Sequence, residues 1–387
     1  MYLRPGIRLN KRLYITTLGF VLILIITWGC NNKKVTVQPQ MEEVVIETPT
    51  DLTLQALDYA DSVIISMTLE ERVGQCLMPS ISSRNDSSTI SILRKYIKDY
   101  HVGGIVLMKG GLQDAAVLSE IAHKARVPLF VAIDAEWGLG MRLDSAPVYI
   151  KNGKIDKAMG ENSIYDYGQQ IAKECREIGI NIVLGPVVDI SSAREGVMAN
   201  RSFGSDPDLV SAFGIAYAKG LESGGIMSVA KHFPGHGSVM EDSHVKVARL
   251  NKNIAGLDST DLKPFKDYIE EGLSGIMAGH IQAPALDPGG SVATVSMDML
   301  TSLLREEMGF KGLIFTDAFD MGGAKGLSVS DALKAGADII LCPSDLEKDY
   351  SGIMEDVRNG NLPLSIIDSH CRRILFYKYL FSVIPLQ

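Results

Sequence analysis

Several features that mark particular protein classes are scarce in this chain of 387 residues. Its 5 cysteines form neither a CxxC pair nor a Cys/His spacing of the zinc-site type, so no disulfide framework or zinc site is predicted. Lys and Arg number 38 against 46 Asp and Glu, and a net charge of -8 offers no basic surface for a nucleic-acid backbone. No glycine-rich segment has the strand-to-helix context of a nucleotide loop. We therefore expect no metal, no nucleotide cofactor and no nucleic-acid partner, and nothing indicates a required protein partner.

A long membrane-spanning run is also missing, because the apolar stretch from Leu13 to Trp28 has sixteen residues, whereas a spanning helix needs about 20. A basic head precedes it, formed by Arg4, Arg8, Lys11 and Arg12. Cys30 follows Gly29, and a Cys after a small residue resembles the lipobox of bacterial lipoproteins. We expect residues 1–29 to be a signal peptide and Cys30 to be lipidated; an uncleaved anchor and simple secretion are the alternatives. All three place the body outside the cytoplasm, and the first predicts lipid anchoring to a bacterial membrane on its periplasmic or cell-surface side.

The expected mature chain divides into a short polar segment and one large domain. Residues 30–53 contain the lipidated Cys and then polar, Pro-containing sequence without clear periodicity, which is typical of a tether. We expect residues 54–387 to form the domain, and because its last helical stretch ends at Phe381 we expect no second one. Loss of residues 1–29, which carry four cations and no acid, would change the net charge from -8 to -12.

Within this domain, runs rich in Val, Ile and Gly alternate with stretches of helical spacing, which is typical of repeated βα units and a parallel sheet. Eight such runs begin at Val73, Gly103, Pro128, Ile180, Gly225, Ser274, Gly312 and Ala337. The intervening stretches, such as 165–179 and 297–309, carry apolar residues three and four apart and stop at Gly. Eight strands favour an α/β fold of the closed (β/α)8 TIM-barrel type, with an open doubly wound sheet as the alternative.

Polar residues stand where the predicted strands end, at Asp134, Asp189, Lys231, His232, His280 and Asp317. In a barrel the carboxyl ends of the strands meet at one mouth, which is where active sites lie.

At these ends the sequence contains KHFPGHG from Lys231 followed by DSH at Asp242 to His244. Further motifs are GPVVDI from Gly185, ANRSFGSDP from Ala199, AGHIQAPALD from Ala278 and FTDAFDM from Phe315. Together they resemble glycoside hydrolase family 3 over about residues 57–385. The DSH element is similar to the single-domain β-N-acetylglucosaminidase (β-hexosaminidase) branch, whose acid/base is a His on a barrel loop.

Retaining glycoside hydrolysis needs a nucleophilic carboxylate and a proton donor for the leaving oxygen. Asp317 ends the seventh strand, and the resemblance implies that it is the nucleophile; a helix N-cap is the alternative. The resemblance also implies that His244 is the acid/base. A His titrates near neutrality, and Asp242 two residues earlier could orient its ring. Without the motif, a His in a polar loop is more often a solvated surface residue.

The resemblance implies five substrate-binding residues, namely Asp134, Arg142, Arg201, Lys231 and His232. Lys231 and His232 could instead form structural ion pairs with Asp134 or Asp189, and Arg201 could anchor a loop. The segment DAEWGLGMR departs from the family pattern at Trp137, which could stack on a sugar or simply pack. Three further residues, Asp189, His280 and Asp320, are expected to support the site rather than touch the substrate. We expect Cys76, Cys175, Cys342 and Cys371 to be buried as small apolar residues.

These observations predict a retaining exo-β-N-acetylglucosaminidase that removes terminal GlcNAc from peptidoglycan fragments or other glycans through a glycosyl-aspartate intermediate. A phosphorylase of the same fold, a β-glucosidase or β-xylosidase, and a lipoprotein that binds glycans without cleaving them are the alternatives.

Overall fold

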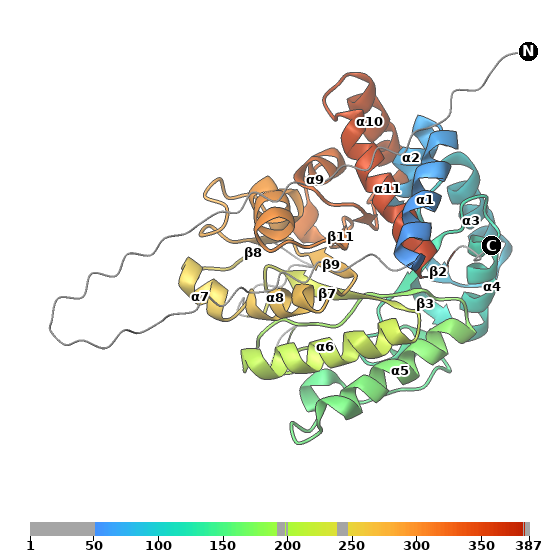
Figure 1. Cartoon of the computed structure of the whole chain (residues 1–387). Helices are drawn as coiled ribbons and strands as arrows, with labels where there is room; N and C mark the ends of the chain where they lie inside the picture. The colour runs from blue at the N-terminus through green and yellow to red at the C-terminus, as the bar shows by residue number, and fades with distance from the viewer. Residues whose placement is uncertain (1–50, 192–197, 199, 238–246, 382, 384–387) are drawn as a thin grey trace, which may run out of the picture. The chain divides into compact units, whose positions relative to one another are not determined.

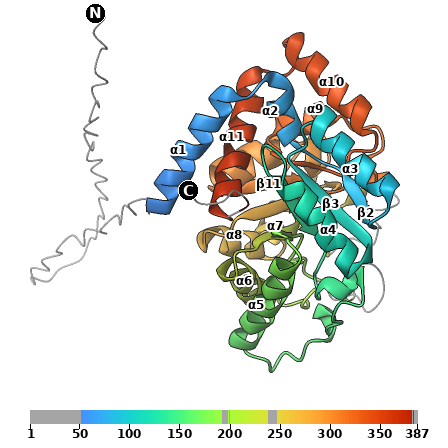
Figure 2. The ribbon, with the colours of Figure 1, turned by 90° about the vertical axis from the view of Figure 1, so that its right-hand side faces the viewer.

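The computed structural model describes residues 51–191, 198, 200–237, 247–381 and 383. This part of the chain is an α/β fold in which helices surround a parallel sheet (Figures 1 and 2). None of the helices formed by these residues is both long and apolar enough to cross a membrane. The predicted signal peptide (1–29), Cys30, Asp242 and His244 lie outside the described residues.

The main sheet follows the chain order with parallel pairing throughout, in the order β11-β9-β7-β6-β4-β3-β2. Its strands are β2 (Ser80–Ser83), β3 (Gly104–Gly111), β4 (Phe130–Ile133), β6 (Ile182–Val183), β7 (Met227–Phe233), β9 (Gly275–Ala278) and β11 (Leu313–Thr316). A further parallel pair joins β1 (Leu77–Met78) to β12 (Ile340–Leu341). Short strands not predicted from the sequence are β5 (Leu143–Asp144), which pairs with β3, and β8 (Ala248–Arg249), which pairs with β10 (Ile281–Gln282). Each of the eight predicted runs therefore contains a strand.

The longer helices are α1 (Asp51–Ser66), α2 (Leu69–Gln75), α3 (Ser87–Asp99), α4 (Leu112–His123), α5 (Glu161–Glu177), α6 (Pro207–Ser223), α7 (Ile254–Ser259), α8 (Lys263–Glu270), η4 (Asp298–Glu307), α9 (Val329–Ala335), α10 (Leu346–Arg358) and α11 (Leu364–Leu380). Short 3-10 turns are η1 (Leu139–Met141), η2 (Asn152–Lys154), η3 (Ala293–Val295) and η5 (Gly322–Ala324). Because helices cover the sheet, β4, β7, β9 and β11 are buried along their whole length, which explains why β4, β9 and β11 are almost entirely apolar; β7 also buries Ser228, Lys231 and His232.

The sequence prediction was wrong at two boundaries. The first predicted strand starts at Val73, but that residue lies in α2, and the strand begins only at Leu77. Thr68 caps α2 by accepting a hydrogen bond from the Glu71 backbone N–H, while the Glu71 side chain accepts from the Thr68 backbone. This capping box fixes the start of the helix. The predicted tether to residue 53 is also too long, because α1 starts at Asp51 and buries Ala56 and Ala60.

Candidate active site

A cavity of about 460 Å³ opens at the carboxyl ends of the strands. Its lining comprises Val106, Met108, Asp134, Glu136, Met141, Arg142, Leu184, Arg201, Lys231, His232, Met277, Asp317, Ala318, Asp320, Met321, Leu341 and Cys342. All five predicted substrate-binding residues and the predicted nucleophile are in this set. The volume is within the range typical of small-ligand sites, about 300–1,000 Å³.

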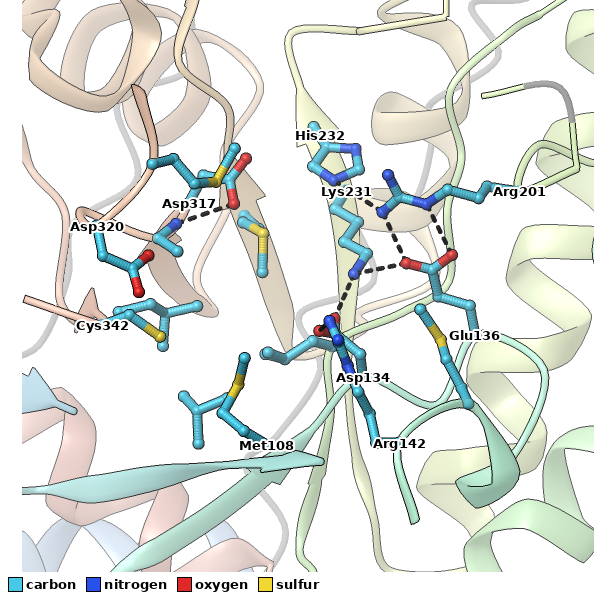
Figure 3. A pocket seen from close by; sticks show the side chains of 17 residues that line it. Met108, Asp134, Glu136, Arg142, Arg201, Lys231, His232, Asp317, Asp320 and Cys342 are labelled. Atoms are coloured by element: carbon cyan, nitrogen blue, oxygen red, sulfur yellow. Dashed lines mark hydrogen bonds and ion pairs between the residues drawn. The ribbon is translucent and has the colours of Figure 1, made fainter. Parts of the chain in front are cut away.

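Asp134, directly after β4, is held by two cations from different parts of the chain. Its Oδ1 accepts from Lys231 Nζ at 2.8 Å, and its Oδ2 accepts from Arg142 Nη2 at 2.5 Å (Figure 3). Burial raises the pKa of the Asp134 carboxyl, but the charges of Lys231 and Arg142 outweigh this and hold it well below its usual range. Asp134 is therefore an anionic acceptor whose position is fixed before any ligand binds.

Glu136 is a site residue that the sequence reasoning missed. It is only 1% exposed, and its Oε1 accepts from Lys231 Nζ at 2.9 Å. Arg201 forms a bidentate salt bridge with Glu136, in which Nε donates to Oε2 at 2.9 Å and Nη2 donates to Oε1 at 2.7 Å. Burial raises the pKa of the Glu136 carboxyl, but the charges of Arg201 and Lys231 outweigh this effect and lower the pKa to about 2. Its position two residues after Asp134, beyond a buried strand, is the signal that could have predicted it.

A bulge in β7 allows two consecutive residues to reach the cavity. The pairing register with β9 shifts between Lys231 and Phe233, so His232 has no partner in the ladder. Side chains normally alternate across a strand, and an extra residue re-aims them. The structural pairs that the sequence left open for Lys231 and His232 do exist, with Asp134 and Asp189 respectively, and both side chains also line the cavity.

Asp317 follows β11 and faces the group of paired charges from the other side of the cavity (Figure 3). Its backbone N–H donates to the Ala278 carbonyl at 2.8 Å, and its Oδ1 accepts from the Ala318 N–H at 2.9 Å. Burial raises the pKa of the Asp317 carboxyl, yet the fields of His232 and His280 and the Ala318 N–H lower it below the ordinary value. The side chain is thus an ionised carboxylate at neutral pH.

The three residues expected to support the site differ in position. Asp189 and His280 are buried and do not line the cavity; His280 lies 3.0 Å from both the Thr294 hydroxyl and the Ala318 carbonyl. Asp320 departs from the prediction because it lines the cavity itself.

Trp137 and the cysteines have more ordinary surroundings. Trp137 is not in the cavity lining, and Lys151 Nζ lies 5.1 Å from the centre of its ring. The four cysteines in the described part of the chain are buried and free, as expected, although Cys342 also borders the cavity.

Apolar and polar groups share the cavity wall. The methionines Met108, Met141, Met277 and Met321, with Val106, Leu184 and Leu341, supply apolar surface between the charged groups. Sugar rings present hydroxyl groups at their edges and C–H groups on their faces, so this mixture suits a carbohydrate.

The fold and this cavity define the class of the protein, a parallel α/β protein with a ligand site where its strands end. Residues 68–376 match the description "Glycosyl hydrolase family 3 N terminal domain". The chain belongs to glycosyl hydrolase family 3.

Relatives named as hexosaminidases share about a third of the sequence. "Beta-hexosaminidase A" of Pseudoalteromonas piscicida is 31% identical over 329 residues, which cover 74% of this chain and 55% of that protein. "Beta-hexosaminidase LpqI" of Mycobacterium tuberculosis is 31% identical over 335 residues, covering 80% and 82%. A solved β-N-acetylglucosaminidase of the family from Paenibacillus sp. str. FPU-7 has a TM-score of 0.75 and 29% identity, covering 83% of this chain and 65% of that one. The chain thus spans about half of the first relative and less than two thirds of the Paenibacillus protein.

Proposed function

We propose that this protein is a retaining exo-β-N-acetylglucosaminidase that hydrolyses terminal β-linked GlcNAc. The observation that carries the proposal is the cavity itself, in which an ionised Asp317 faces the fixed charges of Asp134, Glu136, Lys231 and Arg201. The names of the relatives support GlcNAc as the terminal sugar.

Asp317 is the proposed nucleophile. Its carboxylate attacks the anomeric carbon, the bond to the leaving oxygen breaks, and a glycosyl ester forms on Asp317. The lowered pKa of Asp317 supports this step, because only the ionised carboxylate attacks. Water then cleaves the ester and regenerates the carboxylate.

His244 is proposed to protonate the leaving oxygen and afterwards to remove a proton from the attacking water, with Asp242 orienting its ring. Both residues lie outside the described part of the chain, so this step rests on the sequence motif alone.

The opposite wall is proposed to bind the sugar hydroxyls. Asp134 offers acceptor oxygens, while Arg142, Arg201 and Lys231 offer donors, and these groups already hold one another in place. A site with prearranged donors and acceptors loses little freedom on binding. Such a wall rejects ligands that lack the matching hydroxyls.

We also propose that the strands close into a (β/α)8 barrel. Only Pro79 separates β1 from β2, and Phe315 of β11 bridges to Ile339 beside β12. The Thr316 N–H donates to the Ile339 carbonyl at 2.9 Å, and the Ile340 N–H donates to the Cys76 carbonyl at 2.8 Å. These contacts support a β1–β12 pair that completes the ring between β11 and β2. Slow hydrogen exchange of the Thr316 and Ile340 amides, comparable to those of β7, is expected; rapid exchange would contradict closure.

The enzymatic proposal is tested with the full chain in mild detergent and with nitrophenyl β-GlcNAc and nitrophenyl β-glucoside, with and without phosphate. We expect faster release from the GlcNAc substrate, free GlcNAc as product in both buffers, and loss of release in Asp317→Ala. Sugar 1-phosphate as the product would instead identify a phosphorylase, and preference for the glucoside a β-glucosidase. No turnover by folded protein under any condition would leave a glycan-binding protein.

Peptidoglycan fragments are proposed as natural substrates, and the protein is proposed to be exported and lipid-anchored through Cys30. The sequence pattern of residues 1–30 supports the anchoring. Expression in bacteria with a labelled fatty acid should label the full chain and leave Cys30→Ser unlabelled. Equal labelling of the Cys30→Ser variant would contradict the anchor.

A further inference from the structure

Asp189 is a buried carboxylate that the mechanism above does not use. It is 1% exposed and lies behind the cavity wall. Its Oδ2 is 2.7 Å from His232 Nδ1, and its Oδ1 accepts from the backbone N–H groups of His232 at 3.2 Å and His236 at 2.6 Å. An ionised carboxylate can only accept hydrogen bonds, so in the contact between Asp189 Oδ2 and His232 Nδ1 the proton belongs on Nδ1.

The other nitrogen of His232 meets a donor. Its Nε2 lies 3.4 Å from Arg201 Nη2, which also donates to Glu136 Oε1 at 2.7 Å. A guanidinium has donors and no acceptor, so Nε2 faces it as an acceptor. His232 lines the cavity and its contact with Arg201 is long, so a hydroxyl of a bound sugar can replace Arg201 as the donor to this lone pair.

We propose that Asp189 is a positioning residue that fixes the tautomer of His232, so that the cavity-facing Nε2 accepts a hydrogen bond from a sugar hydroxyl. Two further contacts give Asp189 a second effect. By holding the N–H groups of His232 and His236, it fixes the turn that precedes Asp242 and His244 in the chain. This inference deepens the proposed function and rests on it for the identity of the ligand.

The molecule contains a matched pair for comparison. His370 Nδ1 lies 2.8 Å from Asp338 Oδ1, but its Nε2 lies 3.0 Å from the Leu333 carbonyl, which is an acceptor. His370 is buried outside the cavity lining. We therefore expect Nε2 of His370 to carry a proton and Nε2 of His232 to carry none.

The first test needs no catalysis. In ¹⁵N-histidine-labelled full chain, His232, assigned through loss of its signals in His232→Gln, should show a protonated Nδ1 and an unprotonated Nε2 at neutral pH. His370 should show a protonated Nε2 in the same spectrum. A proton on Nε2 of His232 would overturn the proposal, and this result is independent of whether the protein hydrolyses GlcNAc.

The second test reverses the tautomer. In Asp189→Asn, the amide oxygen must keep the two backbone N–H groups, so the amide NH₂ donates to His232 Nδ1 and places the proton on Nε2. We expect kcat/KM for nitrophenyl β-GlcNAc to fall about 100-fold, mainly through KM. Removal of the sugar hydroxyl that contacts His232, tested with deoxy substrates, should abolish most of the difference between variant and wild type. Asp338→Asn makes the same substitution beside His370, outside the cavity lining, and should leave KM and kcat of the folded protein within about twofold.

Two controls keep the result interpretable. Asp189→Glu preserves the acceptor and should recover part of the lost affinity, which a purely structural effect of the substitution would not predict. Binding of free GlcNAc by calorimetry reports on the site even if turnover is absent. A folded Asp189→Asn variant with wild-type KM and GlcNAc affinity would refute the proposal.

Discussion

The two ends of the strands carry similar groups of buried charge in different surroundings. At the carboxyl ends, Asp134 and Glu136 are paired with Lys231, Arg142 and Arg201 beside an open cavity. At the amino ends, near the start of β11 and β12, Asp338 is 0% exposed, and its side chain pairs with Arg305, Arg373, His370 and the Ile314 N–H.

The two groups differ in what their polar atoms face. Those around Asp338 face other protein groups, whereas those around Asp134 also face the cavity. The Asp338 oxygens are filled by protein donors, and the charges of Arg305, Arg373 and His370 more than offset burial and keep the pKa of Asp338 far below normal. In the cavity, Arg142 retains 29% side-chain exposure and Asp134 17%. We infer that buried ion pairs stabilise the fold where they are enclosed by protein and serve ligand binding where they border the cavity. The predictions below test this division, from the largest expected effect to the smallest.

The largest effect is expected for Asp317→Ala, which removes the proposed nucleophile. We expect kcat/KM for nitrophenyl β-GlcNAc to fall by about 10⁴-fold or more. The free energy of unfolding in urea should not fall by more than about 1 kcal/mol, because active-site residues are seldom optimised for stability. A variant that keeps a tenth of the wild-type activity would exclude the assigned role.

Asp338→Ala should show the opposite pattern. It leaves Arg305, Arg373 and His370 without their shared carboxylate, and breaking a buried ion pair costs about 3–5 kcal/mol. Urea unfolding measures this loss, and kcat/KM per folded molecule should be unchanged. Asp331→Ala is the control, since its pair with Lys334 is exposed and worth less than about 1 kcal/mol. Equal free energies of unfolding for Asp338→Ala and Asp331→Ala would contradict a stabilising role for the buried ion pairs of Asp338.

Glu136→Gln tests the charge that the sequence did not reveal. The amide keeps the shape but weakens the hold on Arg201 and Lys231, so we expect kcat/KM to fall about 10- to 100-fold. Steady-state kinetics on the purified full chain measure this fall in kcat/KM. Unchanged kinetics would mean that Arg201 and Lys231 are positioned without Glu136.

The last prediction, the smallest per pH unit and the most specific, concerns Lys378 in α11. It is fully buried, donates to Gln75 Oε1 at 2.7 Å, and burial lowers its pKa to about 7 from the usual 10.5. Between these values the unfolded chain binds more protons than the folded one, so the free energy of unfolding should rise with pH, by at most about 1.4 kcal/mol per pH unit. Below pH 7 the contribution is constant.

Lys378→Met removes this titration. The difference in unfolding free energy between wild type and variant should therefore change between pH 7 and 10.5 in favour of the wild type, as measured by urea unfolding. A difference that is constant over this range would show that Lys378 keeps its charge on folding.

Much of the fold could be predicted because most of the buried parallel strands, such as β4 and β9, are apolar throughout. Val73 was misassigned because residues 73–78 contain only one polar side chain, Gln75, and so resemble one strand; the Thr68 and Glu71 capping box marks a helix start before them. The pairing of β1 with β12 has no local signal, since Leu77 and its partner Ile340 lie more than 250 residues apart in the chain.

Site residues that belong to a sequence motif could be predicted, whereas residues whose role depends on contacts distant in the chain could not. Asp317, Lys231 and His232 stand in recognisable motifs at strand ends and reach the cavity. Glu136 was missed because its importance comes from Arg201, which is 65 residues away in the chain. The position of Asp320 on the cavity wall likewise depends on how the chain turns after β11.

The central claim is that Asp317 attacks the sugar, and trapping its glycosyl ester tests this most directly. The full chain is incubated with a fluorinated GlcNAc fluoride, whose ester hydrolyses slowly, and digested peptides are analysed by mass spectrometry. We predict one added sugar on the peptide containing Asp317 and none in Asp317→Ala. A sugar attached to any other residue, or no attached sugar while the enzyme turns the reagent over, would contradict the account.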